Sequence, residues 1–161
     1  MSIPSIYLET TIFNFPFVDD APQYKADTLK LFADIKDGKF KPYTSTYITE
    51  ELEKTNSGEK LAKMKALIKD YEITVLETNN EIIELAKAYI KAGVIPERFF
   101  TDALHIAVAT VYGLDFIVSL NFKHIVKHKT KLLTEGINAM LGYSHIYILA
   151  PAEVISYEKD A

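Results

Sequence analysis

Acidic residues stand beside three separate predicted elements of the chain. Glu9 directly follows the apolar run 5–8, and Glu51 with its neighbour Glu50 comes soon after a second such run. Asp102 opens a long helical segment. A carboxylate that ends an apolar strand must be paired or bind a cation, because burying it alone is costly. Clustered carboxylates among oxygen-rich neighbours suit Mg²⁺ or Mn²⁺, so we expect such a metal site if the fold brings these acids together.

Each acid also has an ordinary structural explanation. A carboxylate at a helix start commonly caps the helix or interacts with its dipole, which would account for Asp102. Glu50 and Glu51 would suit a solvated helix face, and Glu9 would suit a salt bridge to a lysine. The conjunction of acids at the ends of distinct elements is what favours a metal site.

Hydroxyl, amide and imidazole side chains accompany these acids in the sequence. Thr10 directly follows the first acid, while Ser119 and Asn121 follow a later apolar strand. His105 stands three residues after Asp102, so on a helix the two would share a face. His105 would then either orient a neighbouring carboxylate or be a histidine satisfied beside the helix core.

Short apolar or β-branched runs alternate with segments of helical periodicity along the chain. Strands are predicted over residues 5–8, 42–45, 73–76, 115–119 and 145–149. Helices are predicted over residues 24–35, 48–54, 61–68, 81–92, 101–112, 122–127 and 133–141. Strands separated by helices indicate parallel pairing, so we expect a three-layer α/β sandwich with a parallel sheet of about five strands, in one domain over residues 1–161. Ligands of such sheets bind beyond the carboxyl ends of the strands.

Composition narrows the kinds of site that the chain can hold. The 161 residues include 22 acidic and 18 basic side chains, a formal charge of −4, and no cysteine. The lack of cysteine excludes disulfides, thiolate zinc sites, iron–sulfur clusters and cysteine nucleophiles, and it fits a reducing, cytoplasmic setting. No apolar stretch reaches the roughly 18–20 residues of a membrane span, so no membrane is expected as a partner. The motifs GxGxxG, GxxxxGKS/T and GxSxG are also absent.

One basic segment interrupts this acidic balance. Residues 123–132 hold no acid and four lysines: Lys123, Lys127, Lys129 and Lys131. The rest of the chain then has 14 basic against 22 acidic residues, a balance of −8. A solvated helix face would explain the run, but its place directly after Asn121 would also let its cations guide phosphates. Arg98, four residues before Asp102, would hold either a phosphate or that carboxylate.

Four motifs fall in an order and spacing that resemble those of PIN-domain ribonucleases, a class that includes the VapC-type toxins of toxin–antitoxin pairs. They are Tyr-Leu-Glu-Thr-Thr at 7–11, Ser-Thr-Tyr-Ile-Thr-Glu-Glu-Leu at 45–52, Thr-Asp-Ala-Leu-His-Ile-Ala at 101–107 and Val-Ser-Leu-Asn-Phe-Lys-His at 118–124. The resemblance spans nearly the whole chain, and the last two motifs are the more specific. It implies a parallel sheet of order 3-2-1-4-5 and an acidic cluster that holds one or two Mg²⁺ or Mn²⁺ ions.

The resemblance also implies a role for each matching residue. Glu9, Glu51 and Asp102 match the metal ligands, with Glu50 as the close competitor of Glu51. Asn121 takes a fourth position that is often Asp, and it completes the implied catalytic set. The implied reaction is metal-assisted hydrolysis of an RNA phosphodiester bond by water.

Other matching residues would support that reaction. Thr10 and Asn121 would orient water at the ion, with Ser119 and His105 in supporting positions. The basic side chains would contact the RNA: Arg98, Lys123, Lys127, Lys129 and Lys131. As a toxin, such a protein would have an antitoxin as partner and would form a homodimer.

Two positions depart from the family's usual pattern. Glu9 stands where Asp is usual and is one methylene longer, and Asn121 is neutral. The ionised acids would therefore carry three negative charges rather than four, which favours one ion over two. These departures leave a second hypothesis open, a PIN-like module that binds RNA or protein without catalysis. A third hypothesis is another Mg²⁺-dependent phosphohydrolase, because carboxylate clusters recur across folds.

Overall fold

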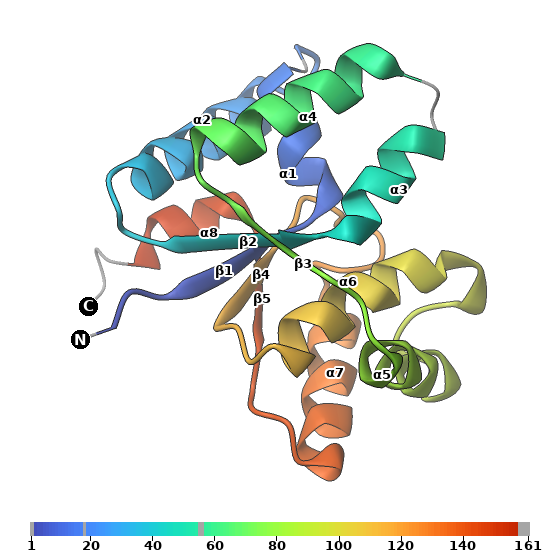
Figure 1. The fold of residues 1–161 in the computed structure, drawn as a ribbon. Coiled ribbons are helices and arrows are strands. Elements are labelled where there is room, and N and C mark those ends of the chain that lie inside the picture. Colours follow the sequence, from blue (N-terminus) through green and yellow to red (C-terminus); the bar gives the residue numbers. More distant parts are fainter. Residues whose placement is uncertain (1, 18, 55–56, 158–161) are drawn as a thin grey trace.

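The computed structural model describes residues 2–17, 19–54 and 57–157, and five strands form one sheet between two layers of helices (Figure 1). Every neighbouring pair of strands is parallel, and their order is β3-β2-β1-β4-β5. The expected α/β class and strand order are therefore confirmed. The strands are β1 (Ser5–Leu8), β2 (Lys41–Ser45), β3 (Thr74–Leu76), β4 (Phe116–Val118) and β5 (Tyr147–Leu149).

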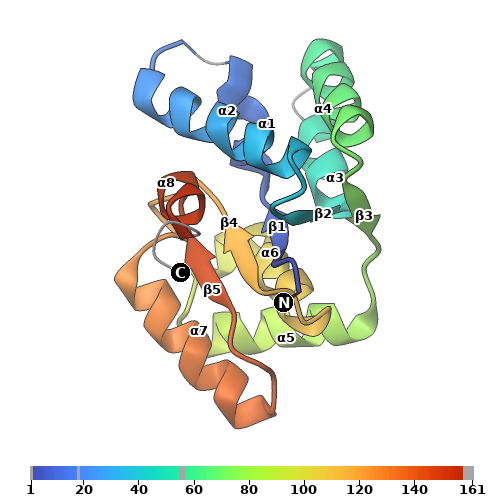
Figure 2. The same cartoon turned by 90° about the vertical axis from the view of Figure 1, so that its left-hand side faces the viewer.

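Helices cover both faces of the sheet (Figure 2). One layer contains α1 (Thr10–Asn14), α2 (Pro22–Lys36), α3 (Thr46–Lys54), α4 (Gly58–Asp70) and α8 (Pro151–Ile155). The other layer contains α5 (Asn80–Lys91), α6 (Phe100–Val111) and α7 (His128–Leu141). Two 3₁₀ turns, η1 (Phe15–Phe17) and η2 (Glu97–Phe99), precede α2 and α6. In the described part of the chain, no helix is both long and apolar enough to cross a membrane.

The alternation of side chains along β1 decides which layer each of its residues meets. Ile6 and Leu8 pack with the α1–α4 layer, whereas Tyr7 between them packs with the α5–α7 layer. This follows because successive side chains of a strand point to opposite faces. The layer that Tyr7 meets is centred on α6, whose residues 103–110 are all buried. The phenol of Tyr7 therefore lies beneath the sheet, directed at α6.

The largest departure from the predicted elements lies after β4. The helix predicted over residues 122–127 is wrong, because this segment forms turns and α7 begins only at His128. The carbonyl of Asn121 accepts hydrogen bonds from the backbone N–H groups of Ile125 and Val126, at 3.0 and 2.8 Å, which closes the turn. Helices α1 and α8 were not predicted because each has only five residues, too few for a helical period to show.

Gly136 inside α7 and Gly142, which directly follows the helix, are expected to respond oppositely to replacement by alanine. Gly142 ends the helix at φ +82°, where an L side chain is strained, so Gly142→Ala should lower the free energy of unfolding by about 1 kcal/mol. Gly136 lies inside the same helix, and a Cβ added there meets no atom within 4 Å. Gly136→Ala should therefore raise the free energy of unfolding by about 0.5–1 kcal/mol. Urea denaturation measures both, and changes of the same sign would contradict this account of the helix end.

Candidate functional site

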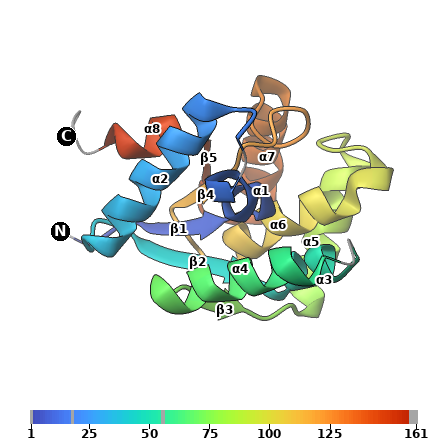
Figure 3. The same ribbon diagram turned by 90° about the horizontal axis from the view of Figure 1, so that it is seen from above.

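The carboxyl ends of the parallel strands share one edge of the sheet, and polar side chains from several elements lie along it. Helices α1 and α3 follow β1 and β2 almost directly at this edge (Figure 3). Glu9 stands between β1 and α1, Glu51 lies within α3, and Asp102 lies in the first turn of α6. The fold thus brings the acids from three distant parts of the chain to the same edge.

Glu9 is only 3% exposed and caps α1. Its Oε1 accepts hydrogen bonds from the backbone N–H and the hydroxyl of Thr11, at 3.2 and 2.6 Å, and from the hydroxyl of Ser119 at 2.6 Å. Among the described residues no lysine pairs with this carboxylate, and its Oε2 accepts no hydrogen bond. Hydroxyl groups therefore hold Glu9 by one oxygen and leave the other available.

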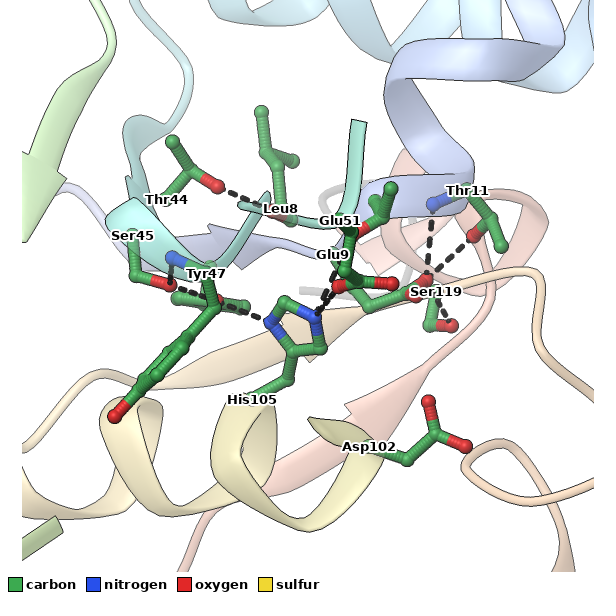
Figure 4. A network of polar contacts seen from close by, with 12 residues as sticks. Leu8, Glu9, Thr11, Thr44, Ser45, Tyr47, Glu51, Asp102, His105 and Ser119 are labelled. Atoms are coloured by element: carbon green, nitrogen blue, oxygen red, sulfur yellow. Dashed lines mark hydrogen bonds and ion pairs between the residues drawn. The ribbon is translucent and has the colours of Figure 1, made fainter. Parts of the chain in front are cut away.

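Of the two neighbouring glutamates of α3, the structure turns Glu51 toward this edge and leaves Glu50 exposed. The Oε1 of Glu51 accepts hydrogen bonds from the hydroxyl of Thr10 at 2.7 Å and from Nε2 of His105 at 2.5 Å (Figure 4). Neither hydrogen bond involves the Oε2 of Glu51. Thr10 thus contacts a carboxylate directly in this structure.

His105 is completely buried and links Glu51 to the underside of the sheet. Its Nδ1 lies 2.5 Å from the hydroxyl of Tyr7, which lies 2.7 Å from the hydroxyl of Ser45. Burial alone would lower the pKa of His105, but the hydrogen bond and charge of Glu51, with the charges of Glu9 and Asp102, raise it overall. Burial would likewise raise the pKa of Glu51, but His105 and Thr10 lower it overall. The two side chains therefore favour the ion pair, and His105 both packs in the core and orients a carboxylate.

Asp102 lies beside the other two acids without a hydrogen bond to either (Figure 4). Burial raises its pKa to about 6, and the negative charges of Glu9 and Glu51 contribute to the rise. The charge of His105 and a hydrogen bond with the Asn121 side chain oppose it. The charges of Glu9 and Glu51 thus act on Asp102 at this edge of the sheet, although burial is the larger cause of the rise.

The donor set fits one divalent cation in chemistry, although it is not arranged as a finished metal cage. Within residues 2–17, 19–54 and 57–157, no three His, Cys, Asp or Glu side chains are grouped so that they could hold a metal ion. The free Oε2 atoms of Glu9 and Glu51 are oxygen donors of the type that Mg²⁺ and Mn²⁺ prefer. A cation there would also reverse the rise in the pKa of Asp102, because a positive charge favours the ionised carboxylate.

Asp102 has a second neighbour, His124, in the turn after β4. The Nδ1 of His124 lies 3.2 Å from the Asp102 Oδ2, and its ring stacks on that of Phe99 with centroids 3.8 Å apart. Burial lowers the pKa of His124, and the positive charges of Lys123, Lys127 and Arg98 lower it further. Three of the predicted RNA-contacting cations therefore act on His124, which contacts Asp102.

The remaining basic candidates have other surroundings. Lys129 is exposed in the first turn of α7, and the Nζ of Lys131 lies 3.9 Å from the carboxylate of Glu153. The guanidinium of Arg98 lies 4.9 Å from the Phe99 ring centroid, and no ion pair joins it to Asp102 among the described residues. Arg98 was expected to hold either Asp102 or a phosphate, and without this ion pair its guanidinium remains available for a phosphate.

Two residues of the site were given no role from the sequence: Tyr7 and Thr11. Thr11 has a local signal, since a hydroxyl two residues after an acid at a helix start commonly joins the capping hydrogen bonds. Tyr7 has none, because its partners Ser45 and His105 are distant in the sequence.

Searched against models of known protein families and against curated proteins, the sequence matches none. The case for a function therefore rests on the side chains at this edge of the sheet and on the motifs that contain them.

Replacing Asp102 with Asn should stabilise the metal-free protein at neutral pH. Folding raises the pKa of Asp102 from 3.8 to about 6, so the folded state favours the protonated carboxyl. The stability that this carboxyl contributes is fully present below pH 3.8 and is lost as the pH rises through about 6. We expect Asp102→Asn to raise the free energy of unfolding by about 1–2 kcal/mol at pH 7.5 and by almost nothing near pH 3.5. Urea denaturation in EDTA measures the difference, and a gain independent of pH would contradict this origin.

Proposed function

We propose that the protein is a Mg²⁺- or Mn²⁺-dependent endoribonuclease. The observation that carries the proposal is that Glu9, Glu51 and Asp102 lie at the same carboxyl edge of the sheet, where burial, and then the charges of the two glutamates, raise the pKa of Asp102. Crowded carboxylates are unfavourable unless a cation binds among them. The resemblance of the surrounding motifs to PIN-domain ribonucleases supports RNA as the substrate.

In this proposal the three acids would hold one divalent cation. When bound, the ion would supply Lewis-acid activation of water and charge neutralisation at the phosphate. With His105 and Glu51 as an ion pair, Glu9 and Asp102 leave two formal negative charges, which one divalent cation would balance. The charge of the site therefore favours a single ion.

The protein's own hydrogen bonds would keep the donors in place. The chain from Ser45 through Tyr7 and His105 holds Glu51 from beneath the sheet, at 2.7, 2.5 and 2.5 Å. Ser119 holds Glu9 in the same way. Such outer contacts orient ligands and tune their basicity.

Cations near His124 would bring the substrate to this site. Lys123, Lys127 and Arg98 act electrostatically on His124, which lies against Asp102. A phosphate group approaching between these cations and the carboxylates would be oriented without sequence specificity, as expected of backbone contacts. A role as the toxin of a type II pair, as a cytoplasmic homodimer controlled by an antitoxin, belongs to the proposal on the resemblance alone.

A second candidate function is a PIN-like module that binds RNA or protein without catalysis. The observation that favours it is the engagement of Glu51 by His105, together with the absence, among the described residues, of a three-ligand metal group.

Cleavage of RNA should require both a divalent cation and Glu51. We expect cleavage of single-stranded RNA in Mg²⁺ or Mn²⁺, its loss in EDTA, and a fall of at least about 100-fold for Glu51→Gln, since even outer-shell partners are worth about 10–100-fold. Glu50→Gln is the matched control, one residue away and exposed, and should keep wild-type activity. Cleavage that needs the metal but survives both Glu51→Gln and Asp102→Asn would move the active site elsewhere.

Binding of Mn²⁺ separates the nuclease from the module that binds without catalysis. Calorimetric titration of the wild type should show about one bound ion per chain, and Asp102→Asn should weaken that binding by about 10-fold or more. Glu50→Gln should bind as the wild type does. No heat of binding at millimolar Mn²⁺ would favour the module over the nuclease.

A further inference from the structure

Two exposed aromatic rings lie beside the carboxylate site and take no part in it. Tyr24 of α2 and Phe122 of the turn after β4 have ring centroids 5.4 Å apart and ring planes inclined at 34°. Each side chain is 40% exposed. Phe15, which ends α1, packs its edge against Tyr24 at 5.8 Å and 82°. We call Tyr24 and Phe122 the aromatic platform, with Phe15 as its support.

The hydrogen bonds that hold Glu9 also hold the segment that carries Phe122. Ser119 donates to Glu9 at 2.6 Å, and the backbone N–H of Leu120 donates at 2.8 Å to the Thr11 hydroxyl, which itself donates to Glu9. Phe122 follows only two residues after Leu120. The platform is therefore held in a defined position relative to the carboxylates.

The charges around the platform differ between its two sides. Lys123 and Lys127, both exposed, continue the chain from Phe122. On the side of α2, by contrast, Asp20 before Tyr24 is exposed and Asp27 after it is half-buried, while Lys25 is paired with Asp19 at 3.0 Å. A polyanion would therefore run along the lysine side, with its flat groups over the rings. This complementarity favours a nucleic acid over an acidic or apolar peptide.

We propose that the aromatic platform stacks on an unpaired base of single-stranded RNA while Lys123 and Lys127 contact its phosphates. The inference rests on the proposed ribonuclease function and adds to it a site that contacts a base. Base–aromatic stacking is tolerant of sequence and needs bases that a duplex does not present.

Fluorescence anisotropy tests this proposal with a labelled, unstructured RNA oligonucleotide in EDTA, where no metal-dependent cleavage occurs. Tyr24→Ala and Phe122→Ala should each weaken binding by about 5- to 10-fold, and Phe122→Leu, which keeps an apolar side chain, should weaken it as well. Tyr24→Phe keeps the ring and should bind as the wild type does. Tyr112→Ala is the matched control, because Tyr112 is 42% exposed and follows the opposite end of α6 from Asp102.

The outcomes separate this inference from the nuclease proposal. If the wild type cleaves RNA but both alanine variants bind RNA with unchanged affinity, the platform alone is overturned, and the rings are assigned to a protein partner. If the platform variants bind RNA more weakly but the wild type does not cleave RNA, the stacking proposal is supported and the ribonuclease proposal is contradicted. An equal loss of affinity for duplex RNA would overturn stacking. Melting temperatures of the variants verify that each is folded.

Discussion

His105 and Glu51 join helix α6 to helix α3 at the carboxyl edge of the sheet. The imidazole is wholly buried, and the carboxylate it contacts lies beside two further acids. A buried imidazolium without a carboxylate would be strongly unfavourable, and crowded carboxylates without a nearby cation would repel one another. Each partner therefore makes the other tolerable, and removal of either would leave an uncompensated charge at the site.

This pair makes the three acids unequal. Glu51 is held by His105 and Thr10, and Glu9 is held by hydroxyl groups of α1 and of the segment after β4. Burial is the main reason that the pKa of Asp102 rises, and the charges of Glu9 and Glu51 add to the rise. Glu9 and Glu51 are therefore held in place by hydrogen bonds, whereas Asp102 is unfavourable in its charged form. A single bound cation would stabilise that charge.

The surface beside the site depends on the same contacts. The hydroxyl of Thr11 bonds to Glu9 and also receives the backbone N–H of Leu120, so the cap of α1 and the turn after β4 are held together. This link fixes the position of the exposed Phe122 ring relative to the buried carboxylate of Glu9. Any ligand that contacted both would find them already ordered, which lowers the entropy cost of binding.

The sequence by itself determined the class of fold and the placement of polar residues at the ends of its elements. The apolar run 5–8, for example, is β1 with the predicted bounds, because strand and helix periods are local properties of the chain. The resemblance matched Glu51 ahead of Glu50, but only packing shows which of the two faces the site, since neighbours on a helix point about 100° apart and it is Glu51 that meets His105 of α6. Tyr7 and His105 are 98 residues apart, and they meet because α6 packs beneath β1. The turn at 122–127 arose likewise from hydrogen bonds to the carbonyl of Asn121, which override a local helical pattern and which no periodicity encodes.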